Sequence, residues 1–118
     1  MNVLIVYAHP EQKSFNGAMK DTAVETLSAA GHDVVVSDLY AMGFNPVASR
    51  EDMTGEMTNP DFFSLATEQT AAYEGGRTAP DIAAEMDKLQ RADLVIFQFP
   101  VWWFGMPAML KGWADRVF

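Results

Sequence analysis

The stretch Ala92–Phe118, ADLVIFQFPVWWFGMPAMLKGWADRVF, decides the fold. Its part Leu94–Phe97 is a short apolar, β-rich run, typical of a strand buried on both faces of a parallel sheet. A turn with bulky side chains follows at Val101–Gly105, and Pro107 favours a helix start because it lacks the amide hydrogen that a first turn leaves unpaired. In open α/β sheets, ligands bind beyond the carboxyl ends of the strands. The aromatic turn therefore suggests a pocket for a flat, conjugated ligand.

The beginning of the chain predicts a strand–helix–strand unit. Val3–Ala8 is a continuous apolar run, and a second strand lies within Asp33–Leu39. Between them, Ser14 is a candidate helix N-cap and Gly31 a candidate C′ residue. The expected apolar face of this helix consists of Phe15, Ala18, Met19, Ala23, Leu27 and Ala30. Such a unit implies a right-handed crossover between parallel strands.

The segment from 41 to 80 is mostly polar with several turn signals, and it predicts a long excursion. One helix is expected near Leu65–Tyr73, ended by glycines. A further helix is expected from about Pro80, and its apolar face consists of Ile82, Met86 and Leu89. Three acidic residues of the excursion are expected to solvate a loop, namely Glu51, Asp52 and Glu56.

The composition limits the classes of function. The chain has 118 residues, 49% of them apolar and 20% charged, which indicates one globular domain over 1–118. A net charge of −8 without a basic run argues against nucleic-acid binding. The absence of cysteine fits a reducing, cytoplasmic compartment, and the start of the chain predicts no secretory signal. Two distant histidines and no cysteine argue against a metal site.

The predicted sheet contains few strands for its class. Three strands are visible, and the sequence reaches Phe118 inside an apparent helix. A doubly wound sheet usually has about five strands. The residues allow a small three-stranded domain, or a chain truncated after the third strand and the start of the following helix. We favour the second interpretation.

The first candidate site is the loop His9–Asn16, HPEQKSFN, which joins a buried strand to a helix N-terminus. Free amides and the helix dipole favour an anion at such a junction. Ser14 and Asn16 add polar donors, and His9 or Lys13 adds positive charge. The loop matches neither GxxxxGK[ST] nor GxGxxG. The same residues also suit an ordinary capped loop.

The second candidate site is the turn Pro100–Gly105. The aromatic side chains could hold a planar heterocycle, with Gly105 allowing a close approach of the backbone. Alternatively, they pack in a core or at a subunit interface. In the strand order 2-1-3, the first and third strands are neighbours at the topological switch point. The loop His9–Asn16, called the anion loop below, and the aromatic turn Pro100–Gly105 then become two ends of one site. This arrangement favours the functional interpretation of both.

The sequence closely resembles the NAD(P)H:quinone oxidoreductase family of the DT-diaphorase type. The matching stretches are Ala8–Lys20, Ser37–Gly55, Ala72–Tyr73 and Pro80–Phe118. The resemblance implies a flavodoxin-like doubly wound parallel sheet and bound FAD, with FMN less expected. It also implies two-electron, ping-pong transfer of a hydride from NAD(P)H to quinones, and a homodimer.

The resemblance also assigns site residues by position. The loop that binds the flavin phosphates and neighbouring groups matches His9, Ser14, Phe15 and Asn16. The segment alongside the isoalloxazine matches Pro100, Val101, Trp102, Trp103, Phe104 and Gly105. Trp103 and Phe104 fall where the family places aromatics around the quinone and nicotinamide pocket. The family's Tyr and His that assist hydride transfer lie beyond Phe118, so no catalytic residue is assigned and the 118-residue chain alone is expected to be inactive.

Two residues depart from the mammalian members of the family. Trp102 stands where those enzymes carry Gln beside the flavin, and Ser64 stands where a Gln lies near the adenine of the partner subunit's FAD. The contacts of the protein with the flavin edge and with the adenine are therefore expected to differ from those of the mammalian enzymes.

Two other functions compete with the reductase. The main alternative is a flavodoxin-like ancillary subunit that regulates a membrane cation-efflux system, and isolation with a membrane partner would favour it. A one-electron carrier is the other alternative, and a stable flavin semiquinone would favour it. The aromatic turn and the long excursion argue for a substrate pocket instead.

Overall fold

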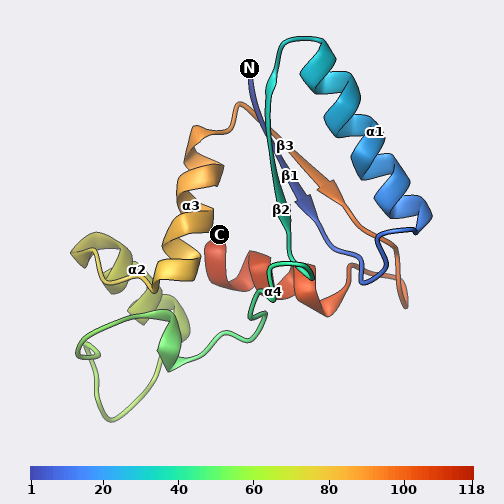
Figure 1. Cartoon of the computed structure of the whole chain (residues 1–118). Helices are drawn as coiled ribbons and strands as arrows, with labels where there is room; N and C mark the ends of the chain where they lie inside the picture. The colour runs from blue at the N-terminus through green and yellow to red at the C-terminus, as the bar shows by residue number, and fades with distance from the viewer.

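The fold is a parallel sheet with helices on both faces (Figure 1). The computed structural model describes residues 1–118. The elements in chain order are β1 (Asn2–Tyr7), α1 (Phe15–Ala29), β2 (Asp33–Asp38), the 3₁₀ turn η1 (Arg50–Asp52), α2 (Leu65–Gly75), α3 (Pro80–Arg91), β3 (Leu94–Gln98) and α4 (Ala108–Val117). The strand order β2-β1-β3 confirms the predicted order 2-1-3.

The central strand β1 is buried on both faces, as its apolar run predicts. Successive side chains of a strand point to opposite faces. Val3, Ile5 and Tyr7 pack under α1. On the opposite face, residues of β1 share a core cluster with α3 and α4, whose main members are Leu4, Val6, Ile82, Leu110 and Trp113. The molecule therefore has three layers, with β1 at the middle of the central one.

Strand β3 differs from its prediction. The expectation that Leu94–Phe97 is buried on both faces is wrong for these residues, because Leu94 is 42% exposed and Phe97 is 39% exposed. β3 pairs with β1 on one side only and forms the edge of the sheet within residues 1–118. An apolar run indicates what a strand can bury, and the neighbouring elements decide what it does bury.

Helix α1 has the predicted ends and only part of the predicted face. Ser14 caps it by accepting a hydrogen bond from the Gly17 amide at 3.0 Å, and Gly31 follows it with a left-handed φ of 89°. Ala23 and Leu27 pack on the sheet, but Phe15 is 78% exposed and Met19 is 45% exposed. The start of the helix lies beside the β3 edge, where no element within residues 1–118 covers these two side chains.

The later helices follow their sequence signals. α2 ends at Gly76, which has a left-handed φ of 69°, and α3 begins at Pro80. The predicted face of α3 packs on the core cluster, with Ile82 only 1% exposed. Pro107 takes the N-cap position of α4, one residue before its expected place inside the first turn. No helix is both long and apolar enough to span a bilayer.

A cluster of charged side chains around the buried pair Arg116–Asp52 connects the excursion to α4. Arg116 donates from Nε to Asp52 at 3.0 Å and from Nη1 to Asp81 at 2.8 Å, and it also binds the Asn45 carbonyl at 2.7 Å. Burial tends to raise the pKa of Asp81, but the hydrogen bond and charge of Arg116 outweigh it and hold that pKa below its usual range. The expectation that Asp52 solvates a loop is wrong, since Asp52 is 2% exposed; Glu51 is exposed as expected.

Candidate cofactor-binding site

The first turn of α1 leaves two backbone amides free. The Ser14 amide donates to the Glu11 carbonyl, and the amides of Gly17 and Ala18 donate to Ser14. The amides of Phe15 and Asn16 have no acceptor within residues 1–118. Free amides at the positive end of a helix form a site for an anion such as a phosphate.

A close packing contact shapes this loop. A Cβ atom at Gly17 would lie 2.2 Å from the Gln12 carbonyl oxygen, so only glycine lets the loop fold against the helix here. The Gln12 side chain donates to Asp38 at the end of β2 at 2.7 Å. The loop is therefore held against the carboxyl ends of the strands.

His9 links the loop to the aromatic turn. Its Nδ1 atom accepts a hydrogen bond from the Glu11 amide at 2.9 Å, which orders the loop. Its ring meets the Trp102 ring edge-on, with centroids 5.8 Å apart. His9 thus serves as a local hydrogen-bond acceptor and also contacts the second candidate segment.

The aromatic turn adopts a strained backbone. Two hydrogen bonds between Trp102 and Gly105 close it, at 2.9 and 3.2 Å. Between them, Trp103 and Phe104 have positive φ angles of 49° and 67°. The left-handed region costs an L-residue about 1–2 kcal/mol, and such strain tends to gather at functional sites. The turn therefore shows a conformation that local propensity opposes.

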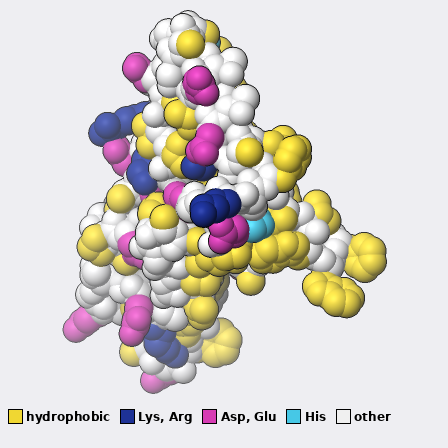
Figure 2. Space-filling view, turned by 45° about the vertical axis from the view of Figure 1, so that its right-hand side comes forward, with side chains coloured by type: hydrophobic (Ala, Val, Ile, Leu, Met, Phe, Trp, Pro, Cys, Tyr) yellow, Lys and Arg dark blue, Asp and Glu magenta, His cyan; other side chains and the backbone are white.

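The two aromatic rings of the turn point away from the core. Trp103 is 94% exposed and Phe104 is 98% exposed. The alternative that these two rings pack in the hydrophobic core of residues 1–118 is therefore wrong. Side chains exposed in the same region include Phe15, Met19, Val101, Trp102 and Met106, whereas Pro100 is half-buried. Figure 2 shows hydrophobic side chains gathered on this side of the molecule, with some standing out into solvent. The turn thus presents an apolar surface that no element of residues 1–118 covers.

The anion loop and the aromatic turn lie side by side. Tyr7 and Gln98 pair at the carboxyl ends of β1 and β3, and the Ala8 amide donates to the Gln98 carbonyl at 3.0 Å. The Gln98 side chain donates from Nε2 to Asn16 Oδ1 at 2.7 Å. The structure therefore brings the loop His9–Asn16 next to the turn Pro100–Gly105 at the carboxyl ends of β1 and β3. Sequence reasoning missed Gln98, because its partner lies 82 positions away and no motif marks the pair.

These residues fit a phosphorylated aromatic cofactor. The two free amides suit a phosphate group, and the exposed rings suit a planar group. A Cβ atom at Gly105 would meet nothing within 4 Å, so the backbone is open to a ligand there.

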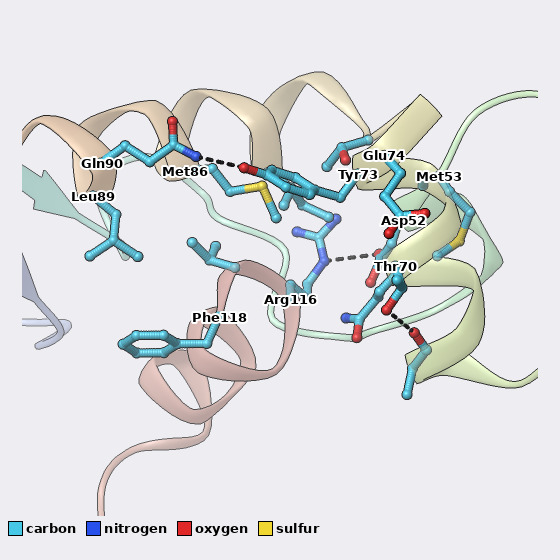
Figure 3. A pocket seen from close by; sticks show the side chains of 16 residues that line it. Asp52, Met53, Thr70, Tyr73, Glu74, Met86, Leu89, Gln90, Arg116 and Phe118 are labelled. Atoms are coloured by element: carbon cyan, nitrogen blue, oxygen red, sulfur yellow. Dashed lines mark hydrogen bonds and ion pairs between the residues drawn. The ribbon is translucent and has the colours of Figure 1, made fainter. Parts of the chain in front are cut away.

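A hollow lies between α2, α3 and α4 and has a volume of about 460 Å³ (Figure 3). Its polar wall contains Asp52 and Arg116, which bind each other. It shares no lining residue with the loop or the turn. None of the predicted site residues therefore lies in this hollow.

The comparisons agree with this architecture. Residues 1–118 match a family model described as "Flavodoxin-like fold", and the chain belongs to this family. The predicted flavodoxin-like sheet is thereby confirmed.

Similar proteins include several quinone reductases. The chain is 59% identical over 114 residues to NAD(P)H dehydrogenase [quinone] 1 of Rattus norvegicus, covering 97% of this chain and 42% of the relative. It is 58% identical over 115 residues to ribosyldihydronicotinamide dehydrogenase [quinone] of Mus musculus, covering 98% and 50%. The crystal structure of a candidate quinone reductase from Klebsiella pneumoniae superposes with a TM-score of 0.95 at 48% identity, covering 99% and 45%. The chain thus spans about half the length of the curated relatives it matches.

Proposed function

We propose that the full-length protein is a flavin-dependent NAD(P)H:quinone oxidoreductase. One observation supports this most directly: the loop that leads to the free amides at the start of α1 contacts the exposed aromatic turn through the rings of His9 and Trp102. The pairing of an anion site with an aromatic surface fits a phosphorylated flavin. The names of the curated relatives support NAD(P)H and quinones as the substrates.

Different residues of this chain bind different parts of the cofactor. Ser14, Phe15 and Asn16 hold the phosphate end of the cofactor, and His9 orders their loop. The turn residues lie along the flavin ring, and they are Pro100, Val101, Trp102, Trp103, Phe104 and Gly105. Trp103 and Phe104 also line the pocket in which the nicotinamide and the quinone alternate. The flavin, when bound, supplies the two-electron chemistry.

Several finer points belong to the same proposal. The cofactor is FAD rather than FMN, the protein is a cytoplasmic homodimer, and residues 1–118 form the N-terminal part of one flavin-binding domain. The close resemblance to the quinone reductases named above supports them. No observation favours the ancillary subunit or the one-electron carrier, so neither is proposed.

The test is to purify the full-length protein, release its ligand by heat and compare the ligand with FAD and FMN standards. We expect FAD, and NAD(P)H oxidation coupled to quinone reduction with ping-pong kinetics. A colourless protein that neither FAD nor FMN reconstitutes would refute the proposal.

A further inference from the structure

We propose that Gln98 is a positioning residue for the phosphate of the flavin. Gln98 fixes the Asn16 side-chain amide so that its N–H group, and not its carbonyl oxygen, faces the phosphate. The inference rests on the proposed function. It starts from the 2.7 Å hydrogen bond that Gln98 Nε2 donates to Asn16 Oδ1.

The chemistry of the amide gives this hydrogen bond its consequence. A primary amide has an acceptor end and a donor end, and the two have nearly the same shape. Gln98 presents its own donor end to Asn16, because the same Nε2 atom also contacts Met19 Sδ at 3.9 Å. Gln98 therefore engages the Oδ1 end, and the Nδ2 end of Asn16 is left without an acceptor in residues 1–118. Without this bond the amide would be free to turn its oxygen toward an anion, which repels it.

The position of Asn16 makes its donor end useful. Asn16 lies in the first turn of α1, next to the free backbone amides of Phe15 and Asn16 itself. The side-chain N–H would add a third donor to these two. The protein carries a net charge of −8, so a phosphate needs such local donors.

Gln98 is well placed to act on Asn16. It is the last residue of β3, its carbonyl accepts the Ala8 amide at 3.0 Å, and its side chain is half-buried. The donor is thus fixed to the sheet, whereas the acceptor belongs to α1. The hydrogen bond sets the orientation of the loop amide from the rigid part of the fold.

The test uses two variants of the full-length protein. Gln98→Glu keeps the shape but only accepts hydrogen bonds, so Asn16 turns Nδ2 toward it and presents Oδ1 to the phosphate. It also adds a negative charge, and the same substitution in an Asn16→Ala background measures the effect of that charge alone; an equal loss there would overturn the positioning role. FMN serves as the probe in place of FAD, because it differs from riboflavin only by its phosphate. We expect FMN affinity to fall about tenfold or more in Gln98→Glu and about threefold in Gln98→Met. Riboflavin lacks the phosphate, and its affinity should change by less than about twofold. Gln90→Glu is the matched control, because Gln90 donates to the Tyr73 hydroxyl in α2, away from the site.

A titration with inorganic phosphate separates this inference from the proposed function. In the flavin-free protein, phosphate should shift the NMR signals of the Asn16 side-chain amide, and Gln98→Glu should abolish that shift. This result would support the positioning role even if the protein bound no flavin and the proposed function failed. Equal losses of FMN and riboflavin, unchanged FMN affinity in Gln98→Glu, or no effect of phosphate on Asn16 would each overturn the inference.

Discussion

At the scale of single residues, the backbone of Trp103 and Phe104 is the most informative feature. A tight turn with two left-handed residues normally uses Asn and Gly, which adopt this conformation cheaply. This chain places two large aromatic side chains there and leaves both almost fully exposed. Neither local propensity nor packing within residues 1–118 stabilises this conformation. We propose that the flavin and its substrates bind against these side chains, which would explain why the two aromatic residues stand here.

Gly105 allows a direct test of how close the flavin lies. Gly105→Val should lower FAD affinity about tenfold, or roughly 1.4 kcal/mol, because the added side chain occupies space that is open only without a ligand. The apo fold should survive, since a Cβ atom there meets nothing within 4 Å. Flavin content and affinity of the purified variant provide the measurement. Gly75→Val, at the end of α2, is the control, and an unchanged affinity in Gly105→Val would place the flavin elsewhere.

Glu68 should make stability depend on pH on the acid side. Its carboxylate accepts hydrogen bonds from the Thr58 hydroxyl, the Thr58 amide and the Asn59 amide. The Thr58 hydroxyl hydrogen bond is the main cause that holds the pKa of Glu68 below its ordinary value of 4.5. The unfolded state therefore takes up the proton first, and the free energy of unfolding should fall as pH drops below about 4.5.

Urea unfolding between about pH 3 and pH 6 measures this dependence. Glu68→Gln should flatten the curve on the acid side and leave its shape near neutral pH unchanged. Glu74→Gln, an exposed residue of the same helix, serves as the control. An equally steep acid side in Glu68→Gln would show that other carboxylates cause the loss of stability.

At the scale of elements, α4 fixes the long excursion to the sheet. A Cβ atom at Gly112 would lie 2.1 Å from the Pro46 carbonyl oxygen. The excursion can therefore cross α4 this closely only because residue 112 has no side chain. Arg116, one turn further along α4, holds η1 and the start of α3 through Asp52 and Asp81. The position of the excursion thus depends on one helix face and one guanidinium.

Removing this guanidinium should weaken the whole arrangement. Arg116→Met should lower the free energy of unfolding by about 3–5 kcal/mol, because it leaves the buried Asp52 carboxylate without a counter-charge. Asp52→Asn should cost less, since its amide oxygen still accepts from Arg116. Chemical denaturation measures both. Arg91→Met breaks an exposed pair with Asp87 and should stay within about 1 kcal/mol of the parent protein; a similar small loss in Arg116→Met would contradict the buried-cluster interpretation.

At the scale of the whole molecule, the sequence predicts what depends on local patterns. The apolar runs Val3–Ala8 and Leu94–Phe97 indicate two strands, and the flavodoxin-like order 2-1-3 makes them neighbours. Composition and spacing do not predict contacts between distant polar residues. Asp52 and Arg116 are 64 positions apart, and Asn16 and Gln98 are 82 apart. The exposure of β3 also escaped prediction, because burial of an edge depends on neighbours rather than on the strand itself.

The apolar surface along β3 and the turn leads to the last prediction, that residues 1–118 expressed alone will not be a competent reductase. Phe15, Trp103 and Phe104 are each more than three-quarters exposed, and β3 has a free edge. Leaving roughly a few hundred Å² of apolar surface in water costs several kcal/mol at about 25 cal/mol/Å², comparable to the whole stability of a small domain, about 5–15 kcal/mol.

We therefore expect aggregation in light scattering, weak flavin binding and little NAD(P)H-dependent quinone reduction per bound flavin. The full-length protein is the control, since the curated relatives are about twice as long as this chain. Equal turnover per flavin would mean that residues 1–118 carry the whole site, and that the exposed rings need no further cover to work.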